Sequence, residues 1–390
     1  MMNKIPKGWE VKKLGEICIL DKGKIENCGE LPYLEVKFLR NLKNADIKEK
    51  GIVVEKNQAV ILVDGENSGE VFKVKTKGYL GSTFRILKLS DNVNFDYFIF
   101  FMNFVSLKFK NSKVGSAIPH LNKKLFNECE IPLPNLTEQK AIADKLDDSF
   151  AKIENAITNL INAKENLKLY KQSVLKSAFN GDLLPSTSPT NWEVKKLGEI
   201  FNIVRGGSPR PIKSYLTDDK NGINWIKIGD IETGSKYITH TKQKILASGL
   251  KKSRAVKAGD LLLTNSMSFG RPYISKINGA VHDGWLIFEP KIQISKDYVF
   301  YFFSSSDTYS KLSNLAVGST VKNLQINFLE NFEIPLPPLS EQNLIVAEID
   351  RRFAIVDKTL NLIDKSIQNA KNLKQSILKK AFSGELRSEI

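Results

Sequence analysis

The stretch WEVKKLGEI at residues 9–17 recurs without a change at residues 192–200, 183 positions further along the chain. Nine identities in a row do not arise by chance, so the chain contains two copies of one plan. Two further pairs repeat at an offset of 203: IPLPNLTEQ at 131–139 with IPLPPLSEQ at 334–342, and KQSVLKSAF at 171–179 with KQSILKKAF at 374–382. The part after each proline-rich joint therefore has a fixed length, whereas the part before it is 20 residues longer in the second copy.

The part of fixed length has the pattern of a long helix. The prolines lie just upstream of it, Thr137 and Ser340 are the expected N-caps, and Gly181 and Gly384 stand where C-caps are needed. Each helix would run for about 42 residues, or roughly 60 Å.

Apolar residues recur at strict sevens along both helices, which is typical of a coiled-coil seam. Lys164 and Lys171 interrupt the seam of the first helix. The alternative, a core helix under a globular domain, stays open, but five successive heptads favour two helices packed against each other. The predicted seam consists of Leu146, Phe150, Ile153, Ile157, Leu160, Leu167 and Val174 in the first helix and of Ile349, Phe353, Val356, Leu360, Ile363, Ile367 and Ile377 in the second.

The parts of variable length have a mixed α/β pattern. Short apolar runs at 59–63 and 260–264 indicate strands, the segments at 78–81 and 279–282 lead into further strands, and 96–101 and 297–302 open short apolar helices. We therefore predict four segments in the order domain, helix, domain, helix. Their boundaries are 1–134, 135–184, 185–337 and 338–390.

The chain of 390 residues carries a formal charge of +15, which favours a polyanionic partner such as nucleic acid or an anionic membrane surface. The stretches 138–180 and 341–383 together hold only +4 of it, so most of the charge belongs to the globular domains. Three scattered cysteines support neither a disulfide framework nor a cysteine-rich zinc site. With no signal peptide and no long apolar run, the expected location is the reducing cytoplasm.

Catalytic signatures are missing from the sequence. It has neither a phosphate-binding loop nor the Asn/Asp-Pro-Pro-aromatic motif of adenine methyltransferases. His120, His240 and His282 are too scattered for an obvious metal site. Glu35-x-Lys37 resembles part of a nuclease signature, but the same pattern also occurs at Glu10 and Glu193. We therefore expect no catalytic residue, no bound metal and no cofactor.

The repeated WEVKKLGEI, the IPLPxLxEQ joints, the AFxG helix ends and the Gly-Ser pairs at 115–116 and 318–319 together resemble the DNA specificity subunit of type I restriction-modification systems. The resemblance covers essentially the whole chain. It implies two target-recognition domains that each read one half of a split, asymmetric site in double-stranded DNA. It also implies that the helices form an antiparallel coiled coil, which gives the chain a pseudo-two-fold repeat, spaces the domains and binds two modification (methyltransferase) subunits, with restriction subunits bound through them.

The second domain shows more of the family's pattern, in Gly206-Gly207-Ser208-Pro209, in WIKIGD at 225–230 and in GDLL at 259–262. The first domain is shorter and departs from it.

Polar or basic residues beside glycines are the best candidates for DNA contacts, because glycine allows the backbone to approach a phosphate. Arg271 and Asn265 are the expected base readers, since Arg pairs with guanine and Asn with adenine in the major groove. For each candidate, a turn or phosphate contact remains the alternative. The full set is Lys22, Lys24, Asn67, Ser68, Ser116, His120 and Lys123 in the first domain, and Arg205, Ser208, Arg210, Asn265, Ser266, Arg271, Ser319, Thr320 and Lys322 in the second.

Two other classes of function compete with a non-catalytic DNA-recognition subunit. A self-sufficient DNA-modifying enzyme would bind S-adenosylmethionine as an isolated chain. A coiled-coil adaptor, whose basic charge serves only solubility, would not retain a specific duplex together with its partner.

Overall fold

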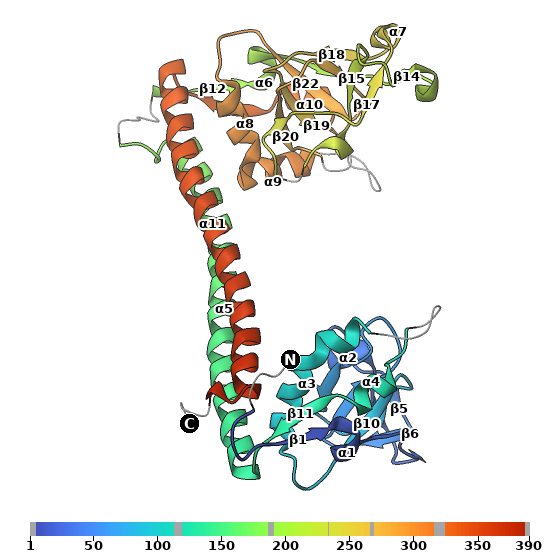
Figure 1. Cartoon of the computed structure of the whole chain (residues 1–390). Coiled ribbons are helices and arrows are strands. Elements are labelled where there is room, and N and C mark those ends of the chain that lie inside the picture. Colours follow the sequence, from blue (N-terminus) through green and yellow to red (C-terminus); the bar gives the residue numbers. More distant parts are fainter. Residues whose placement is uncertain are drawn as a thin grey trace. The chain divides into compact units, whose positions relative to one another are not determined.

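A computed structural model describes residues 5–112, 119–185, 191–232, 234–265, 269–315 and 324–386. The chain packs as two compact units, one formed by residues 1–161 and 364–390 and the other by residues 162–363. Each unit combines one globular domain with part of both long helices (Figure 1). The predicted mixed α/β fold with a repeated domain is confirmed, while the boundaries of the four segments stay a prediction because the units divide both helices.

The first domain contains two larger sheets, with strand orders β2-β10-β7-β8 and β3-β6-β9-β4-β5, besides the two-stranded pair β1-β11. The central strand β7 is buried on both faces. Its Ala59 and Ile61 pack toward α3 and the long helices, and its Val60 and Leu62 pack toward the second sheet. The elements are β1 (Glu10–Lys13), α1 (Leu14–Ile17), β2 (Cys18–Asp21), β3 (Ile25–Glu26), β4 (Leu31–Leu34), α2 (Val36–Leu39), β5 (Ile47–Lys48), β6 (Gly51–Val54), β7 (Ala59–Leu62), β8 (Val71–Lys73), β9 (Gly78–Leu80), β10 (Phe84–Leu89), α3 (Phe95–Lys110), α4 (Lys123–Asn127) and β11 (Glu130–Leu133).

The second domain repeats this plan with additions. The order β13-β22-β19-β20-β16 adds one strand to the first sheet, and the other sheet has the order β14-β17-β15-β21-β18, again with a parallel pair inside it. The elements are β12 (Glu193–Lys196), α6 (Leu197–Ile200), β13 (Phe201–Arg205), η2 (Ile212–Tyr215), β14 (Leu216–Thr217), β15 (Ile223–Ile226), η3 (Ile228–Asp230), β16 (Tyr237–Ile238), β17 (Gln243–Ile245), α7 (Ala247–Leu250), β18 (Arg254–Val256), β19 (Leu261–Thr264), β20 (Pro272–Ser275), β21 (Gly279–Val281), β22 (Trp285–Pro290), α8 (Lys296–Ser304), α9 (Ser306–Leu315), α10 (Ile326–Glu330) and β23 (Glu333–Leu336).

The repeated words of the sequence pair with each other at the base of each domain. Strand β1, from WEVKKLGEI, pairs antiparallel with β11, from IPLP, so that Glu10 faces Leu133. Strands β12 and β23 pair in the same register, with Glu193 facing Leu336. Each two-stranded ribbon therefore leads directly into a long helix.

The two long helices are α5 (Leu136–Asn180) and α11 (Leu339–Phe382). The prediction of Thr137 and Ser340 as N-caps is wrong, because both residues lie inside the first turn. The side chain of Asn135 caps α5 by accepting the N–H of Glu138 at 2.9 Å. Gly181 and Gly384, at φ +84° and +80°, adopt the left-handed conformation expected of C-caps.

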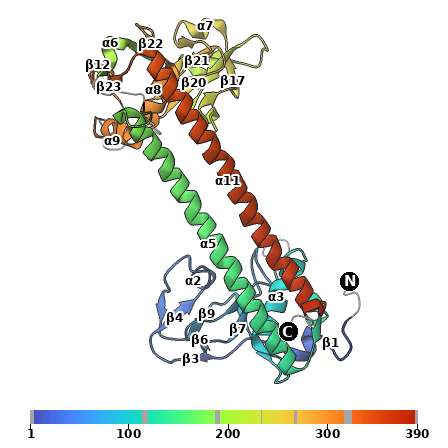
Figure 2. The ribbon, with the colours of Figure 1, turned by 90° about the vertical axis from the view of Figure 1, so that its left-hand side faces the viewer.

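Within each unit, α5 and α11 lie side by side with opposite chain directions (Figure 2). Leu146 of α5 packs in one core with Leu378 of α11, and Val174 of α5 packs in the other core with Ile349 of α11. No residue of the predicted seam is exposed. Those more than nine-tenths buried are Leu146, Ile153, Ile157, Val174, Ile349, Val356 and Ile363, and the others are partly buried.

Lys171, which interrupts the seam, is accommodated by contacts with the facing helix. Its ammonium lies 2.5 Å from Asp357 and 4.6 Å from the ring centre of Phe353, both on α11. In the other unit, Lys374 of α11 pairs in the same way with Glu154 and Phe150 of α5. The charge therefore stays paired while the lysine stem covers apolar surface.

Candidate nucleic-acid interface

Strand register brings several loops of the first domain to one end of a sheet. Strand β2 ends at Asp21 opposite Ile86, and β7 ends at Leu62 opposite Phe84, so both end where β10 begins. The segment 119–121 joins them, because Leu121 donates its N–H to the carbonyl of Val63. We define residues 22–24, 63–70, 81–83 and 119–121 as the first loop edge.

The first loop edge collects most of the candidates of its domain. Lys22 and Lys24 are exposed and make no ion pair with any described residue. His120 lies with Nδ1 2.7 Å from the carboxylate of Asp64, which ties the two loops together. Asn67 is half-buried here, and Lys123 is exposed in the first turn of the nearby helix α4.

Ser68 faces inward at this edge. It is fully buried, and its hydroxyl has no partner among the described residues. The loop turns it inward because Gly65 and Gly69, at φ +104° and +97°, reverse the chain on either side. A DNA contact through Ser68 would need this loop to rearrange. Ser116 lies outside the described residues.

The second domain forms the same edge from the corresponding strands. Strand β13 ends at Arg205 opposite Leu286, and β19 ends at Thr264 opposite Trp285. We define residues 205–210, 265, 269–271, 282–284 and 324 as the second loop edge. Gly206 allows its loops to approach closely, because a Cβ there would lie 2.1 Å from the carbonyl oxygen of His282.

Hydrogen bonds from Arg205 and Ser208 to Asp283 join two segments of the second loop edge, and we call these three residues the clasp. The Ser208 hydroxyl donates to the carboxylate of Asp283 at 2.6 Å, and Nε of Arg205 donates to the carbonyl of Asp283 at 2.8 Å. The hydrogen bond from Ser208 lowers the pKa of Asp283 below its usual value, although partial burial opposes the shift. The neighbouring His282 has a lowered pKa because it is buried, and its Nδ1 accepts the N–H of Gly284. An ionised carboxylate beside a neutral imidazole is therefore presented at this edge near neutral pH.

Asn265, one of the two expected base readers, has only 1% of its surface exposed. Its side-chain amide oxygen accepts the N–H of Leu324 at 3.0 Å, and its backbone N–H donates to the carbonyl of Gly284 at 2.8 Å. In this conformation Asn265 connects three segments of the edge and does not reach the surface.

Arg271, the other expected reader, is exposed and makes no side-chain hydrogen bond or ion pair with a described residue. Arg210 is exposed as well. The position that matches Arg271 in the first domain holds Glu70, which forms an ion pair with Arg40. Ser266, Ser319, Thr320 and Lys322 lie outside the described residues.

Arg271 also borders a cleft of about 820 Å³ in the same unit, beside α8, α9 and the nearby parts of α5 and α11. The cleft exists where a helix is interrupted at Ser305, whereas its counterpart α3 is continuous. Gln172 of α5 supports the interruption by accepting the N–H of Ser306 at 2.7 Å. Lys236 on the wall is 2.7 Å from Asp297 and 4.5 Å from the ring centre of Tyr301.

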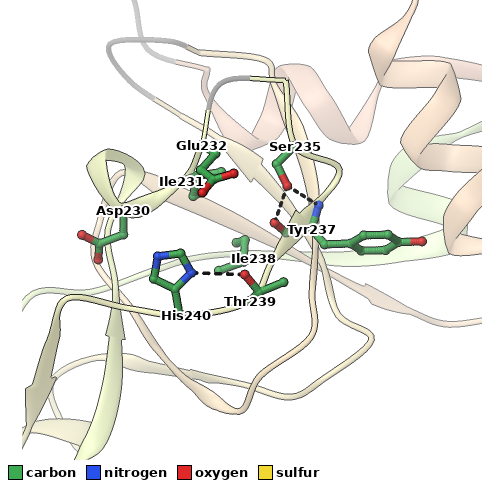
Figure 3. Close-up of a pocket in the computed structure, with 8 residues that line it drawn as sticks. All are labelled: Asp230, Ile231, Glu232, Ser235, Tyr237, Ile238, Thr239 and His240. Carbon is green, nitrogen blue, oxygen red and sulfur yellow. Dashed lines mark hydrogen bonds between the residues drawn. The ribbon is translucent and has the colours of Figure 1, made fainter. Parts of the chain in front are cut away.

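A second cavity, shown in Figure 3, is far smaller. Its volume is about 20 Å³, between Asp230 and His240, where the ring of His240 lies 3.2 Å from the hydroxyl of Thr239. This space suits a single water molecule and no substrate.

The described ranges contain neither a metal-binding cluster nor a helix suited to span a membrane. No group of three or more His, Cys, Asp or Glu side chains is arranged to hold a metal ion. No helix in that part of the chain combines the length and apolarity needed to cross a membrane.

Neither Asp283 nor Gln172 is marked as functional by its neighbours in the sequence. Both act through partners distant in the sequence, Ser208 at 75 positions and Ser306 at 134 positions. For Asp283, the available signal was its place in the turn before a buried strand, in the repeat position that holds Ser82 in the first domain.

The two copies in this chain both match one known protein family. The family description "Type I restriction modification DNA specificity domain" matches residues 6–163 and 189–370. The chain is 30% identical to the type I restriction enzyme MjaVIII specificity subunit of Methanocaldococcus jannaschii, over 98% of this chain and 94% of that protein. It is 25% identical to the EcoDI specificity subunit of Escherichia coli, over 99% and 90%.

Solved structures with 20% identity have the same fold. One is a chain from a study of complex assembly and conformational transition in a type I system, with a TM-score of 0.77 over 97% of this chain and 99% of that one. Another is the HsdS subunit of Thermoanaerobacter tengcongensis, with a TM-score of 0.62 over 98% and 99%.

Proposed function

Because the chain belongs to the family of type I restriction-modification DNA specificity subunits, we propose that each of its globular domains reads one half of a bipartite, asymmetric DNA site. The protein is a non-catalytic DNA-recognition subunit. We further propose that its helices set the distance between the two half-sites and dock two methyltransferase subunits, through which restriction subunits join the complex. The complex would act on double-stranded DNA in the cytoplasm.

The observation that carries this proposal is the pair of loop edges. Both stand at the same end of matching strands, yet their exposed side chains differ. A common scaffold that presents two different sets of side chains suits a protein that recognises two different sequences.

The exposed cations of the edges, together with Lys123 in the adjacent helix α4, are the proposed phosphate or base contacts. Lys22 and Arg205 occupy the same position of the repeat, each directly before a glycine. They are joined by Lys24, Lys123, Arg210 and Arg271. Contacts with phosphate would make binding strongly dependent on salt. We propose supporting roles for the buried Ser68 and Asn265.

Mapping methylation tests this function. The chain is expressed with the modification subunits of its own system, and modified positions are mapped on a library of randomised DNA. We expect one split motif with two different halves and a constant gap. A continuous motif, or methylation without sequence preference, would contradict the proposal.

Replacing Arg271 by Ala separates a base contact from a phosphate contact. A base contact predicts a loss of about 1–3 kcal/mol in specific binding and relaxed choice at one position of the second half-site. A phosphate contact predicts uniform weakening across all sequences and a smaller salt dependence. Binding titrations at several salt concentrations distinguish the two.

A further inference from the structure

The turn 282–284 of the second loop edge carries the carboxylate of Asp283. The cations of the edge suit contacts with phosphate, but a carboxylate does not. The Asp283 side chain is 47% exposed, so water is available to it and burial does not force its hydrogen bond with Ser208. The first domain has Ser82 at this position and no carboxylate in the turn 81–83. The acid is therefore particular to the second domain.

Three features hold this carboxylate in one place. The Ser208 hydroxyl engages Oδ1 at 2.6 Å, and the N–H of Asp283 itself lies 3.4 Å from the same hydroxyl oxygen. Arg205 donates a hydrogen bond from Nε to the backbone carbonyl of Asp283. The preceding His282 is packed between the rings of Trp225 and Trp285, at 6.3 and 6.4 Å between ring centres. The clasp leaves Oδ2 of Asp283 without a partner among the described residues, as it does the terminal N–H groups of Arg205.

A carboxylate is repelled by phosphates, so at a DNA interface it is useful only toward a hydrogen-bond donor. In the major groove, the donors are the amino groups of cytosine (N4) and adenine (N6). The neighbouring guanidinium offers donors to guanine O6 and N7 and offsets the negative charge. The pair can therefore accept from one base and donate to another.

We infer that Asp283 is a specificity-determining residue, which accepts a hydrogen bond from the exocyclic amino group of a cytosine or adenine in the second half-site. Ser208 and Arg205 position it. This inference rests on the proposed function of the second domain as a DNA reader. The alternative is a purely structural role, in which the hydrogen bond between Ser208 and Asp283 only holds two loops together.

The variant Asp283→Asn separates these two roles. Asparagine has the same size, and its Oδ1 can still accept the hydroxyl of Ser208, so the clasp persists. Its amide, however, adds a donor where the carboxylate had only acceptors. A loop-closing role predicts an unchanged motif, whereas a recognition role predicts relaxed or altered choice at one position.

The measurement is methylation of a randomised target library by the complete complex with its modification subunits. For Asp283→Asn we expect discrimination to fall about tenfold at one position of the second half-site, with the first half-site unchanged. Glu289→Gln is the matched control, because this carboxylate lies on the same strand β22 at its far end. We expect the control to leave the motif unchanged.

Ser208→Ala provides the second variant, because it removes the clasp and keeps the carboxylate. We expect a smaller loss of discrimination at the same position. An unchanged motif with Asp283→Asn, a uniform loss at all positions, or an effect of Ser208→Ala at another position would each overturn the inference. If the unaltered complex itself shows no bipartite motif, the proposed function fails instead.

Discussion

At the first junction between domain and long helix, the indole of Trp9 donates to Glu138 at 3.0 Å and the hydroxyl of Tyr97 donates to the carbonyl of Pro132 at 2.7 Å. At the second junction, Trp192 donates to Glu341 at 2.9 Å and Tyr298 to Pro335 at 2.8 Å. These junctions are near copies in residue type, register and distance.

The loop edges offer the opposite case. Equivalent positions of the two edges hold different residues: Lys22 corresponds to Arg205, Ser82 to Asp283 and Glu70 to Arg271. The strands that carry them pair in the same way. Near-identical junctions with different edges indicate that the helix attachment needs particular residues, whereas the edges are free to differ. Equivalent changes should therefore have equal effects at the two junctions wherever the contacts are the same, and unequal effects at the few junction positions where a contact differs and at the edges.

The strongest test of equal junctions is a charge in each core. Leu146→Asp and Ile349→Asp stand 203 positions apart, and both side chains are fully buried. An unpaired buried carboxylate should cost about 3–5 kcal/mol in either unit. Thermal unfolding followed by circular dichroism should show one unit losing stability in each variant. Loss in only one of the two variants would break the equivalence.

A finer test concerns the buried glutamines that follow Glu138 and Glu341. Gln139 accepts the N–H of Asn94 and donates to two carbonyls, whereas Gln342 accepts the N–H of Ser295 and donates to one. Replacement of either glutamine by Leu leaves its backbone partners unpaired. Each buried donor or acceptor without a partner lowers the free energy of unfolding by about 1–3 kcal/mol.

Gln139→Leu should therefore destabilise its unit more than Gln342→Leu does. Urea unfolding measures both changes, with the exposed Gln375→Leu as the control. Equal losses would show that the additional hydrogen bond of Gln139 contributes nothing.

The fold could be predicted from sequence because its determinants are local or repeated. The buried strand at 59–62, the heptads of both helices and the left-handed Gly181 each follow from a short pattern of residue types. The N-cap of α5 was missed because Asn135 and Thr137 are both good capping residues, and only the geometry shows that Asn135 caps the helix by accepting the N–H of Glu138.

The loop edges were less predictable. Ser68 and Asn265 stand beside turns, as exposed residues commonly do, but contacts with segments more than 50 positions away turn Asn265 inward. The break between α8 and α9 is accompanied by a hydrogen bond from the N–H of Ser306 to Gln172, a residue 134 positions away that no neighbouring residue reveals. Such features arise from tertiary contacts, and single-sequence patterns do not encode them.

The smallest expected difference concerns one acidic position at each junction. Asp147 and Asp350 are equivalent, but Tyr301, whose hydroxyl donates to Asp350, is replaced by Phe100 in the first unit. Partial loss of solvent, followed by the nearby carboxylate of Asp96, raises the pKa of Asp147, and Lys73 only partly opposes this shift.

A raised pKa means that the folded state binds this proton more tightly than the unfolded chain, so ionised Asp147 disfavours folding once the pH exceeds both values. Asp147→Asn should therefore stabilise its unit near pH 7 and lose that advantage below the ordinary value of about 3.8. Asp350→Asn should instead destabilise its unit slightly at pH 7, because it weakens the attraction to Lys236 at 3.9 Å. Thermal unfolding at pH 7 and at the lowest pH that retains the fold measures both. Two shifts of the same sign at pH 7 would show that the surroundings of Asp147 and Asp350 do not distinguish the junctions.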